Sequence, residues 1–165
     1  MIVSVTGALV GEIVRLASHP SANRVWLAYV RTSRHGLPDQ IVFGGTQRLH
    51  RGDLVAVAPP GSRATVQGRD KPKKMRARNY RGVQSVGMLC SLNELGWAVG
   101  GPDEVALLRR LRPGYPLDEL PIEDRRRVVL NWRKKIEAPD TMVMAVLAEP
   151  AVQPPRSVAR TLVSA

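Results

Sequence analysis

Short apolar segments that lie between turn residues dominate the first 120 residues of this chain. These segments are rich in β-branched residues and predict strands at 11–14, 25–30, 41–43 and 53–58. Turn residues, such as those at 19–23 and 59–61, separate them. Turn signals roughly every 8–15 residues are typical of a small antiparallel sandwich or barrel. The sequence therefore predicts a mainly β fold.

Three weaker signals extend this pattern. Residues 75–80 fit a strand that would place Arg76 and Arg78 side by side on one face, and 105–108 fit a last strand. Ser91 and Glu94 form a capping box, in which each side chain bonds the backbone N–H of the other, and Gly96 follows at the position of a left-handed cap. We expect one short helical turn there.

The pattern of apolar and charged residues changes after residue 120. Val129, Trp132 and Ile136 have helical spacing, which predicts one amphipathic helix over 122–136 that ends before Pro139. Its apolar face could pack on the same chain or form a dimer interface. We therefore divide the chain into a domain at 1–120, a helical or dimerisation extension at 121–149 and a flexible tail at 150–165.

Positive charge is concentrated in one segment. The chain has a formal net charge of +11. Residues 63–81, here called the basic segment, hold eight lysines and arginines and a single acid, Asp70. A cluster of this kind creates a local positive potential that favours a polyanion such as nucleic acid, although a charge run can also be a solvated loop.

Several classes of protein are not supported by the sequence. The single cysteine, Cys90, excludes a disulfide framework and a multi-cysteine zinc site. We find no metal-ligand spacing, phosphate-binding glycine loop or catalytic constellation, and no apolar stretch near the roughly 20 residues of a membrane span. We expect a cytoplasmic protein that is not an enzyme, with no cofactor, metal or membrane partner.

Several motifs resemble the tRNA-binding OB-fold domain of phenylalanyl-tRNA synthetase β subunits, EMAP II-like proteins and free-standing tRNA-binding proteins. The most specific is the run at 81–91, followed by Glu94-Leu95-Gly96; the others are His19-Pro20-Ser21-Ala22-Asn23, 41–45, 51–53 and 58–61. The resemblance implies an OB-fold, a five-stranded Greek-key barrel, here with a short helix and a C-terminal helical extension.

The resemblance and the charge together suggest RNA-binding residues. Lysines and arginines would contact phosphates, serine hydroxyls would contact phosphate or 2′-OH oxygens, and Met88 would offer an apolar surface to a base or sugar. Met88 can equally be a core residue and Ser91 a helix cap. The candidates are Lys71, Lys73, Lys74, Arg76, Arg78, Arg81, Ser85, Met88 and Ser91.

The function that these features favour is a free-standing tRNA-binding protein that grips the outside of folded tRNA. Aromatic residues make up only 4% of the chain, so recognition of backbone shape is favoured over stacking of single-stranded bases. The family resemblance implies a homodimer and allows an adaptor role for an aminoacyl-tRNA synthetase or another tRNA-dependent enzyme. It also allows a different class of function, a secretion-chaperone-like homodimer that binds unfolded polypeptide.

Overall fold

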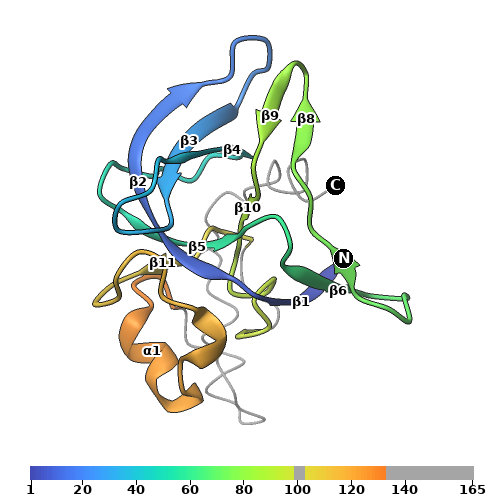
Figure 1. Cartoon of the computed structure of the whole chain (residues 1–165), viewed down its shortest axis with the longest axis vertical. Coiled ribbons are helices and arrows are strands. Elements are labelled where there is room, and N and C mark those ends of the chain that lie inside the picture. The colour runs from blue at the N-terminus through green and yellow to red at the C-terminus, as the bar shows by residue number, and fades with distance from the viewer. Residues whose placement is uncertain (99–102, 133–165) are drawn as a thin grey trace, which may run out of the picture.

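A five-stranded antiparallel path forms the centre of the molecule. The computed structural model describes residues 1–98 and 103–132. The strand order is β10-β5-β2-β3-β4, and β11 also pairs with β5 (Figure 1). These strands are β2 (Leu9–Ser18), β3 (Val25–Arg31), β4 (Asp39–Gly44), β5 (Leu54–Ala58), β10 (Met88–Leu89) and β11 (Leu107–Leu108). The prediction of a mainly β fold is confirmed.

The sheet closes on itself beside β4. The chain just before β10 passes this edge strand, where the Val86 N–H donates to the Gln40 carbonyl at 2.7 Å. The backbone N–H of Val42 donates to the Ser85 hydroxyl at 2.9 Å. Strands from the two ends of the sheet are thereby joined. This arrangement agrees with the OB-fold barrel that the family resemblance implies.

Two smaller sheets flank the barrel. One has the order β1-β6-β7, and the other is the hairpin of β8 and β9. Their strands are β1 (Ile2–Thr6), β6 (Arg63–Val66), β7 (Lys73–Lys74), β8 (Arg78–Tyr80) and β9 (Val83–Ser85). The sequence pattern missed β1, β6, β7, β9 and β10.

The predicted strand at 75–80 is confirmed only for its second half, which is β8, and is wrong for 75–77. Met75 interrupts it because its side chain turns into the core, where it is buried, and its backbone bonds the turn before β6. Met75 donates to the Ser62 carbonyl at 2.8 Å and accepts from the Gly61 N–H at 2.9 Å. Arg76 therefore lies in the connection between β7 and β8, whereas Arg78 lies on β8.

The barrel interior is filled by β-branched side chains from facing strands. Ile13, Val30 and Val55 are completely buried. Gly11 lies among them, and a Cβ atom at this position would come within 2.4 Å of Val30 Cγ1 and 2.7 Å of Val57 Cγ2. The glycine is thus required by side-chain packing in the barrel centre.

The capping box at Ser91 is confirmed. Ser91 N–H donates to Glu94 Oε1 at 2.9 Å, and Glu94 N–H donates to Ser91 Oγ at 3.1 Å. The segment makes a single α-turn, closed by a bond of 3.0 Å from Leu95 N–H to the Ser91 carbonyl. Gly96 follows with a φ of 75°, as expected for a left-handed cap. The α-helix lies elsewhere, at α1 (Arg125–Val128).

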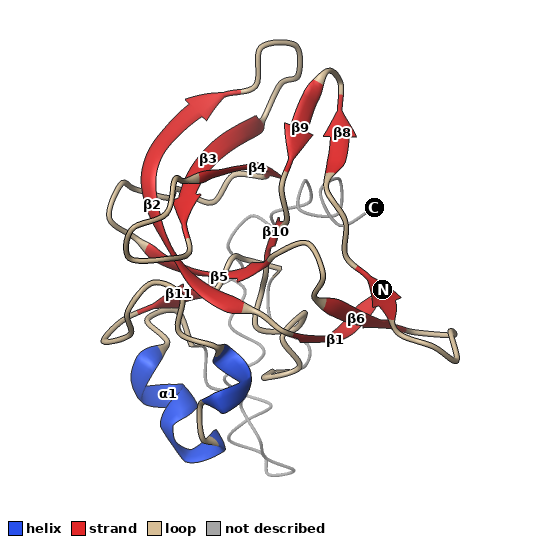
Figure 2. Ribbon diagram, viewed as in Figure 1, coloured by secondary structure: helices blue, strands red, loops and turns tan. Residues whose placement is uncertain are grey.

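The predicted helix over 122–136 is wrong for 129–132, where the described residues are not helical. Short helical turns, η1 (Leu117–Glu119) and η2 (Ile122–Asp124), lead into α1 at one end of the barrel (Figure 2). Val129 then adopts an extended conformation and forms a β-bridge with Leu108. Leu130 N–H also donates to the Leu107 carbonyl at 2.8 Å. Hydrogen bonds to the free edge of β11 thus take the place of helical hydrogen bonds in this segment.

The segment at 129–132 packs on the barrel of its own chain. Val129 is buried, Trp132 is half-buried against the core, and Asn131 bonds the backbone of both Leu107 and Val105. Ile136, the rest of the predicted extension to residue 149 and the predicted tail at 150–165 lie outside the described residues. Across the described helices, none is long and apolar enough to span a membrane.

Candidate nucleic-acid interface

The basic segment lies along one side of the molecule. It begins on β6, continues through the turn before β7 and the connection to β8, and ends at the tip of the β8–β9 hairpin. In Figure 1 this path runs along the right-hand side, from the β6–β7 turn up to β8. Two hairpins therefore display one continuous run of sequence along a single edge, which we call the basic edge.

The structure brings the six predicted basic residues to this edge. Five of them are exposed, and Lys73 is half-buried; the exposed ones are Lys71, Lys74, Arg76, Arg78 and Arg81. Ion pairs among residues 1–98 and 103–132 use the carboxylates of Glu12, Asp53 and Asp124, none of which lies in the basic segment. The cations of the edge are therefore free to attract an external anion.

The electrostatics of Lys73 show that these cations are crowded. Burial of its ammonium group, followed by the positive charges of Arg78 and Arg69, lowers the pKa of Lys73 from its ordinary value of 10.5. Lys73 lies on β7, Arg78 on β8 and Arg69 in the turn before β7. A phosphate placed near these three side chains would relieve their repulsion.

A tight turn presents Arg81 at the end of the basic edge. Tyr80 and Val83 pair across the β8–β9 hairpin, so Arg81 and Gly82 form a two-residue loop. Both have positive φ, 47° and 86°, as a type I′ turn requires. The Gly82 N–H also donates to Asn79 Oδ1 at 2.9 Å. The backbone thus fixes where the Arg81 side chain leaves the hairpin.

The loop between β2 and β3 touches this hairpin. His19 Nε2 lies 2.9 Å from the Tyr80 carbonyl oxygen, and the Ser21 hydroxyl donates to the Arg81 carbonyl at 3.4 Å. The rings of His19 and Tyr80 meet edge to face, with centroids 5.7 Å apart. This motif was expected only to shape a turn. The turn itself is formed, and the contact with residues 60 positions away was missed because no local pattern encodes it.

Ser85, Met88 and Ser91 do not belong to the exposed surface, so we correct their assignment as RNA contacts. Ser85 is 4% exposed, Met88 1% and Ser91 0%. Both serine hydroxyls already bond the backbone, that of Ser85 to Val42 and Gly87 and that of Ser91 to Glu94. Buried and satisfied groups cannot reach a ligand phosphate without local unfolding. Met88 is thus a core residue and Ser91 a helix cap, which are the alternatives that the sequence also allowed.

Two further arginines of the basic segment join the edge. Arg63 is exposed on β6 and pairs in register with Lys74 of β7, and Arg69 is exposed in the turn between these strands. Both contribute to the charge of the basic segment, although neither is among the predicted contacts. The same charge count would have found them.

Among the described residues, no three His, Cys, Asp or Glu side chains gather in a way that could hold a metal ion. Cys90 is fully buried, and its thiol lies 3.8 Å from the Met88 carbonyl. The candidate site is therefore best described as a charged surface.

Comparison with known proteins finds relatives of this chain. A segment of 90 residues is 43% identical to the phenylalanine–tRNA ligase β subunit of Bdellovibrio bacteriovorus and covers 54% of this chain. A segment of 126 residues is 36% identical to the β subunit of Methylococcus capsulatus and covers 73% of this chain. About half of the chain is related to the phenylalanine–tRNA ligase β subunit. The resemblance found from the motifs is thereby confirmed.

The relationship to this β subunit is that of a part to a whole. The matched region is 10% of the Bdellovibrio protein and 14% of the Methylococcus protein. The β subunit of Oceanobacillus iheyensis is similar at 40% identity, again over 10% of its length. The chain thus spans about a tenth of the length of the curated relatives it matches. No family model matches the chain.

Proposed function

We propose that this chain binds tRNA through the basic edge and has no catalytic activity of its own. The observation that carries the proposal is the unpaired and mostly exposed run of cations between Lys71 and Arg81, presented by two hairpins that flank the barrel. Relatedness to a subunit of a tRNA ligase supports tRNA as the polyanion. Lysines and arginines at this edge would replace the counterions of the RNA backbone.

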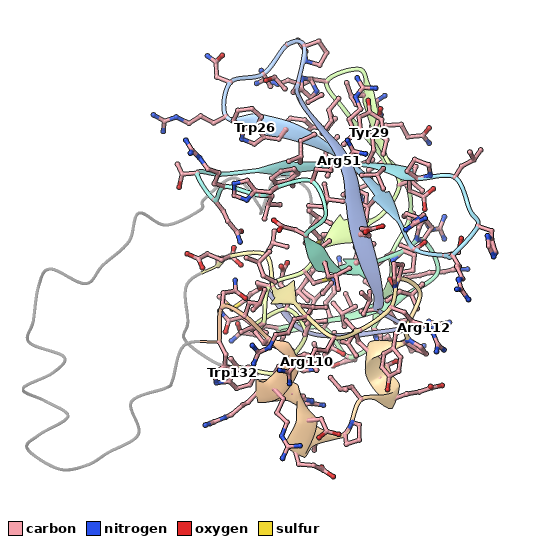
Figure 3. All side chains as sticks on the ribbon, turned by 90° about the vertical axis from the view of Figure 1, so that its left-hand side faces the viewer. Trp26, Tyr29, Arg51, Arg110, Arg112 and Trp132 are labelled. Carbon is pink, nitrogen blue, oxygen red and sulfur yellow. The ribbon has the colours of Figure 1, made fainter. Side chains whose placement is uncertain are left out.

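The positions of the aromatic side chains favour contacts to the backbone of a folded RNA. Trp26 and Tyr29 lie on the side that faces the viewer in Figure 3, which is the left-hand side of Figure 1 and lies away from the basic edge. Phe43 is buried, and the guanidinium of Arg15 covers the Tyr29 ring at 4.8 Å. Tyr80 lies within the basic segment, but it is half-buried and the Arg81 guanidinium lies over its ring. Phosphate contacts would then dominate affinity, with little stacking of bases on aromatic rings.

The test is a triple substitution, Lys74→Ala, Arg76→Ala and Arg78→Ala, measured with a folded tRNA transcript over a range of salt concentrations. We expect weaker binding to every tRNA tested. The slope of log affinity against log salt concentration should decrease by roughly one unit for each phosphate contact removed.

A matched control keeps the loss of charge but changes its place. Arg51, Arg110 and Arg112 are exposed and lie on the opposite side of the molecule (Figure 3). Replacing these three by alanine lowers the net charge by the same amount. We expect a much smaller loss of affinity from this variant, because it leaves the basic edge intact. Equal losses in the two triple variants would contradict the proposed interface.

The proposal includes the protein partners that the resemblance implies. The relatives are β subunits of a tRNA ligase, which favours an adaptor role beside an aminoacyl-tRNA synthetase or another tRNA-dependent enzyme in the cytoplasm. Purification of the native protein at low salt, followed by mass spectrometry, would identify a stoichiometric partner. The mass of the native protein tests the free-standing state, and light scattering tests the homodimer.

Binding of unfolded polypeptide stays a prediction of a different class. Such binding would use apolar surface, so suppression of aggregation should persist at a salt concentration that abolishes tRNA binding. Loss of both activities in the same salt range would instead assign them to the basic edge.

A further inference from the structure

His19 is a buried histidine with both ring nitrogens in hydrogen bonds. It lies in the loop between β2 and β3 and is 5% exposed. The backbone N–H of Ser21 donates to Nδ1 at 3.0 Å, so Nδ1 is an acceptor. The proton of the neutral ring must therefore lie on Nε2, which donates to the Tyr80 carbonyl at 2.9 Å. Each ring nitrogen of His19 thus bonds a different partner.

The two hydrogen bonds of the His19 ring join different parts of the molecule. The Nδ1 bond is local and stabilises the loop itself, because Ser21 is two residues away. The Nε2 bond is long-range and ties the loop to the end of β8, directly before the Arg81-Gly82 turn. The other strand of the hairpin, β9, is held by Gln40 of β4. The side-chain amide of Gln40 donates from its Nε2 to the Gln84 carbonyl at 2.8 Å. The hairpin is therefore anchored to the barrel on both of its strands.

The anchored strand carries part of the basic edge. Arg78 is on β8, and Arg81 follows Tyr80 directly. The guanidinium of Arg81 lies over the Tyr80 ring, 6.0 Å from its centroid. Tyr80 therefore contacts His19 through its carbonyl and its ring, and Arg81 through its ring face. A movement of the hairpin tip would displace Arg81 relative to Lys71 and Lys74.

We propose that His19 is a positioning residue for RNA binding, which holds Arg78 and Arg81 in line with the rest of the basic edge through the Tyr80 carbonyl. The inference rests on the proposed function and adds a residue that is itself out of reach of the RNA. Preorganisation of charged groups in this way saves the cost of ordering them on binding.

Two amide substitutions separate the two hydrogen bonds of the ring. His19→Gln can place an amide N–H near the position of Nε2 and keep the bond to Tyr80. His19→Asn can place an amide oxygen near the position of Nδ1 and keep the bond to Ser21, but it is too short to reach Tyr80. We expect the glutamine variant to retain tRNA affinity and the asparagine variant to lose it by roughly tenfold, as for one charge-assisted contact.

A double-mutant cycle tests whether His19 acts through the two arginines. The loss caused by His19→Asn should disappear in a chain that already carries Arg78→Ala and Arg81→Ala, because no positioned cation remains at the hairpin. It should persist beside the control substitutions Arg51→Ala and Arg112→Ala. An equal loss in both backgrounds would overturn the proposal, since His19 would then act on the fold in general.

A measurement without RNA completes the test. Amide hydrogen exchange in the β8–β9 hairpin should be faster in His19→Asn than in the wild type, and close to wild-type rates in His19→Gln. Equal exchange rates and equal tRNA affinity in all three proteins would reject the positioning role. The proposed function would still stand in that case if the Lys74, Arg76 and Arg78 triple variant had lost affinity, so the two failures are distinguishable.

Discussion

The hydroxyl of Ser85 links β9 to the backbone of Val42 on β4, where the Val42 N–H donates to it at 2.9 Å. The same hydroxyl donates to the Gly87 carbonyl at 3.0 Å, so both of its bonding functions are used. Ser85 and Val42 are 43 positions apart in the chain. A side chain thus supplies part of the bonding at the point where the barrel closes.

Ser85→Ala should destabilise the barrel by about 1–3 kcal/mol, because the buried Val42 N–H would lose its partner. Chemical denaturation measures this change in the free energy of unfolding. The matched control is Ser18→Ala, at an exposed serine of β2, which should change stability by less than about 0.5 kcal/mol. Under conditions where both variants are folded, tRNA affinity should equal that of the wild type. A selective loss of affinity in Ser85→Ala would restore this serine as an RNA contact.

Gly87→Ala should be more damaging than Gly82→Ala, although both glycines have positive φ. Gly87 has a φ of 109°, and an added Cβ atom would lie 2.7 Å from the Ala58 carbonyl oxygen on the neighbouring strand. Gly82 has a φ of 86° and open space around the Cβ position. We expect a loss of about 1 kcal/mol at Gly82 and at least about 2 kcal/mol at Gly87. Thermal unfolding of the two variants checks the order, and similar losses would mean that β10 shifts without cost.

Lys73→Gln should stabilise the protein slightly while weakening tRNA binding. At neutral pH the wild-type ammonium is protonated, partly buried and repelled by Arg78 and Arg69. Its removal should raise the free energy of unfolding by about 0.2–0.5 kcal/mol, a small amount because the group is only partly buried.

The pH dependence of the Lys73→Gln effect has a definite sign. The pKa of Lys73 is lowered in the folded protein, whereas the unfolded chain keeps the ordinary 10.5. As pH rises through the lowered value, the folded state loses the unfavourable proton first, so the wild type gains stability until pH 10.5. The difference between variant and wild type should therefore be largest at neutral pH and should shrink toward 10.5. Unfolding curves at several pH values measure it, and a difference that grows with pH would be the opposite result.

Asn131→Ala should detach the segment after α1 from the barrel. Asn131 Oδ1 accepts from the Leu107 N–H at 2.9 Å, and Nδ2 donates to the Val105 carbonyl at 2.9 Å. Loss of both bonds should cost about 1–3 kcal/mol and speed amide exchange at Leu130. Leu130→Ala serves as the neighbouring control, since this side chain is 59% exposed and its loss should cost little. Equal stability of the two variants would show that Val129 alone holds the segment.

Local patterns in the sequence predicted the parts of the fold that depend on local physics. Short runs of apolar, β-branched residues between turn residues located β2, β3, β4 and β5, because buried strands are apolar and turn residues separate them. The capping box of Ser91 and Glu94 was found because its partners are three residues apart. The charge of the basic segment and its exposure also followed from composition, since unpaired lysines and arginines are rarely buried.

Long-range contacts decided the remainder. Ser85 and Met88 lie in a motif whose residue types suit either RNA or a core, and only closure of the barrel on β4 and β5 assigned them to the interior. Val129 has helical spacing, yet the free edge of β11 drew its backbone into a bridge with Leu108. The sequence by itself determined a cationic β protein with a local charge cluster. The tertiary structure decided which side chains reach the surface, because burial depends on partners that are distant in the chain.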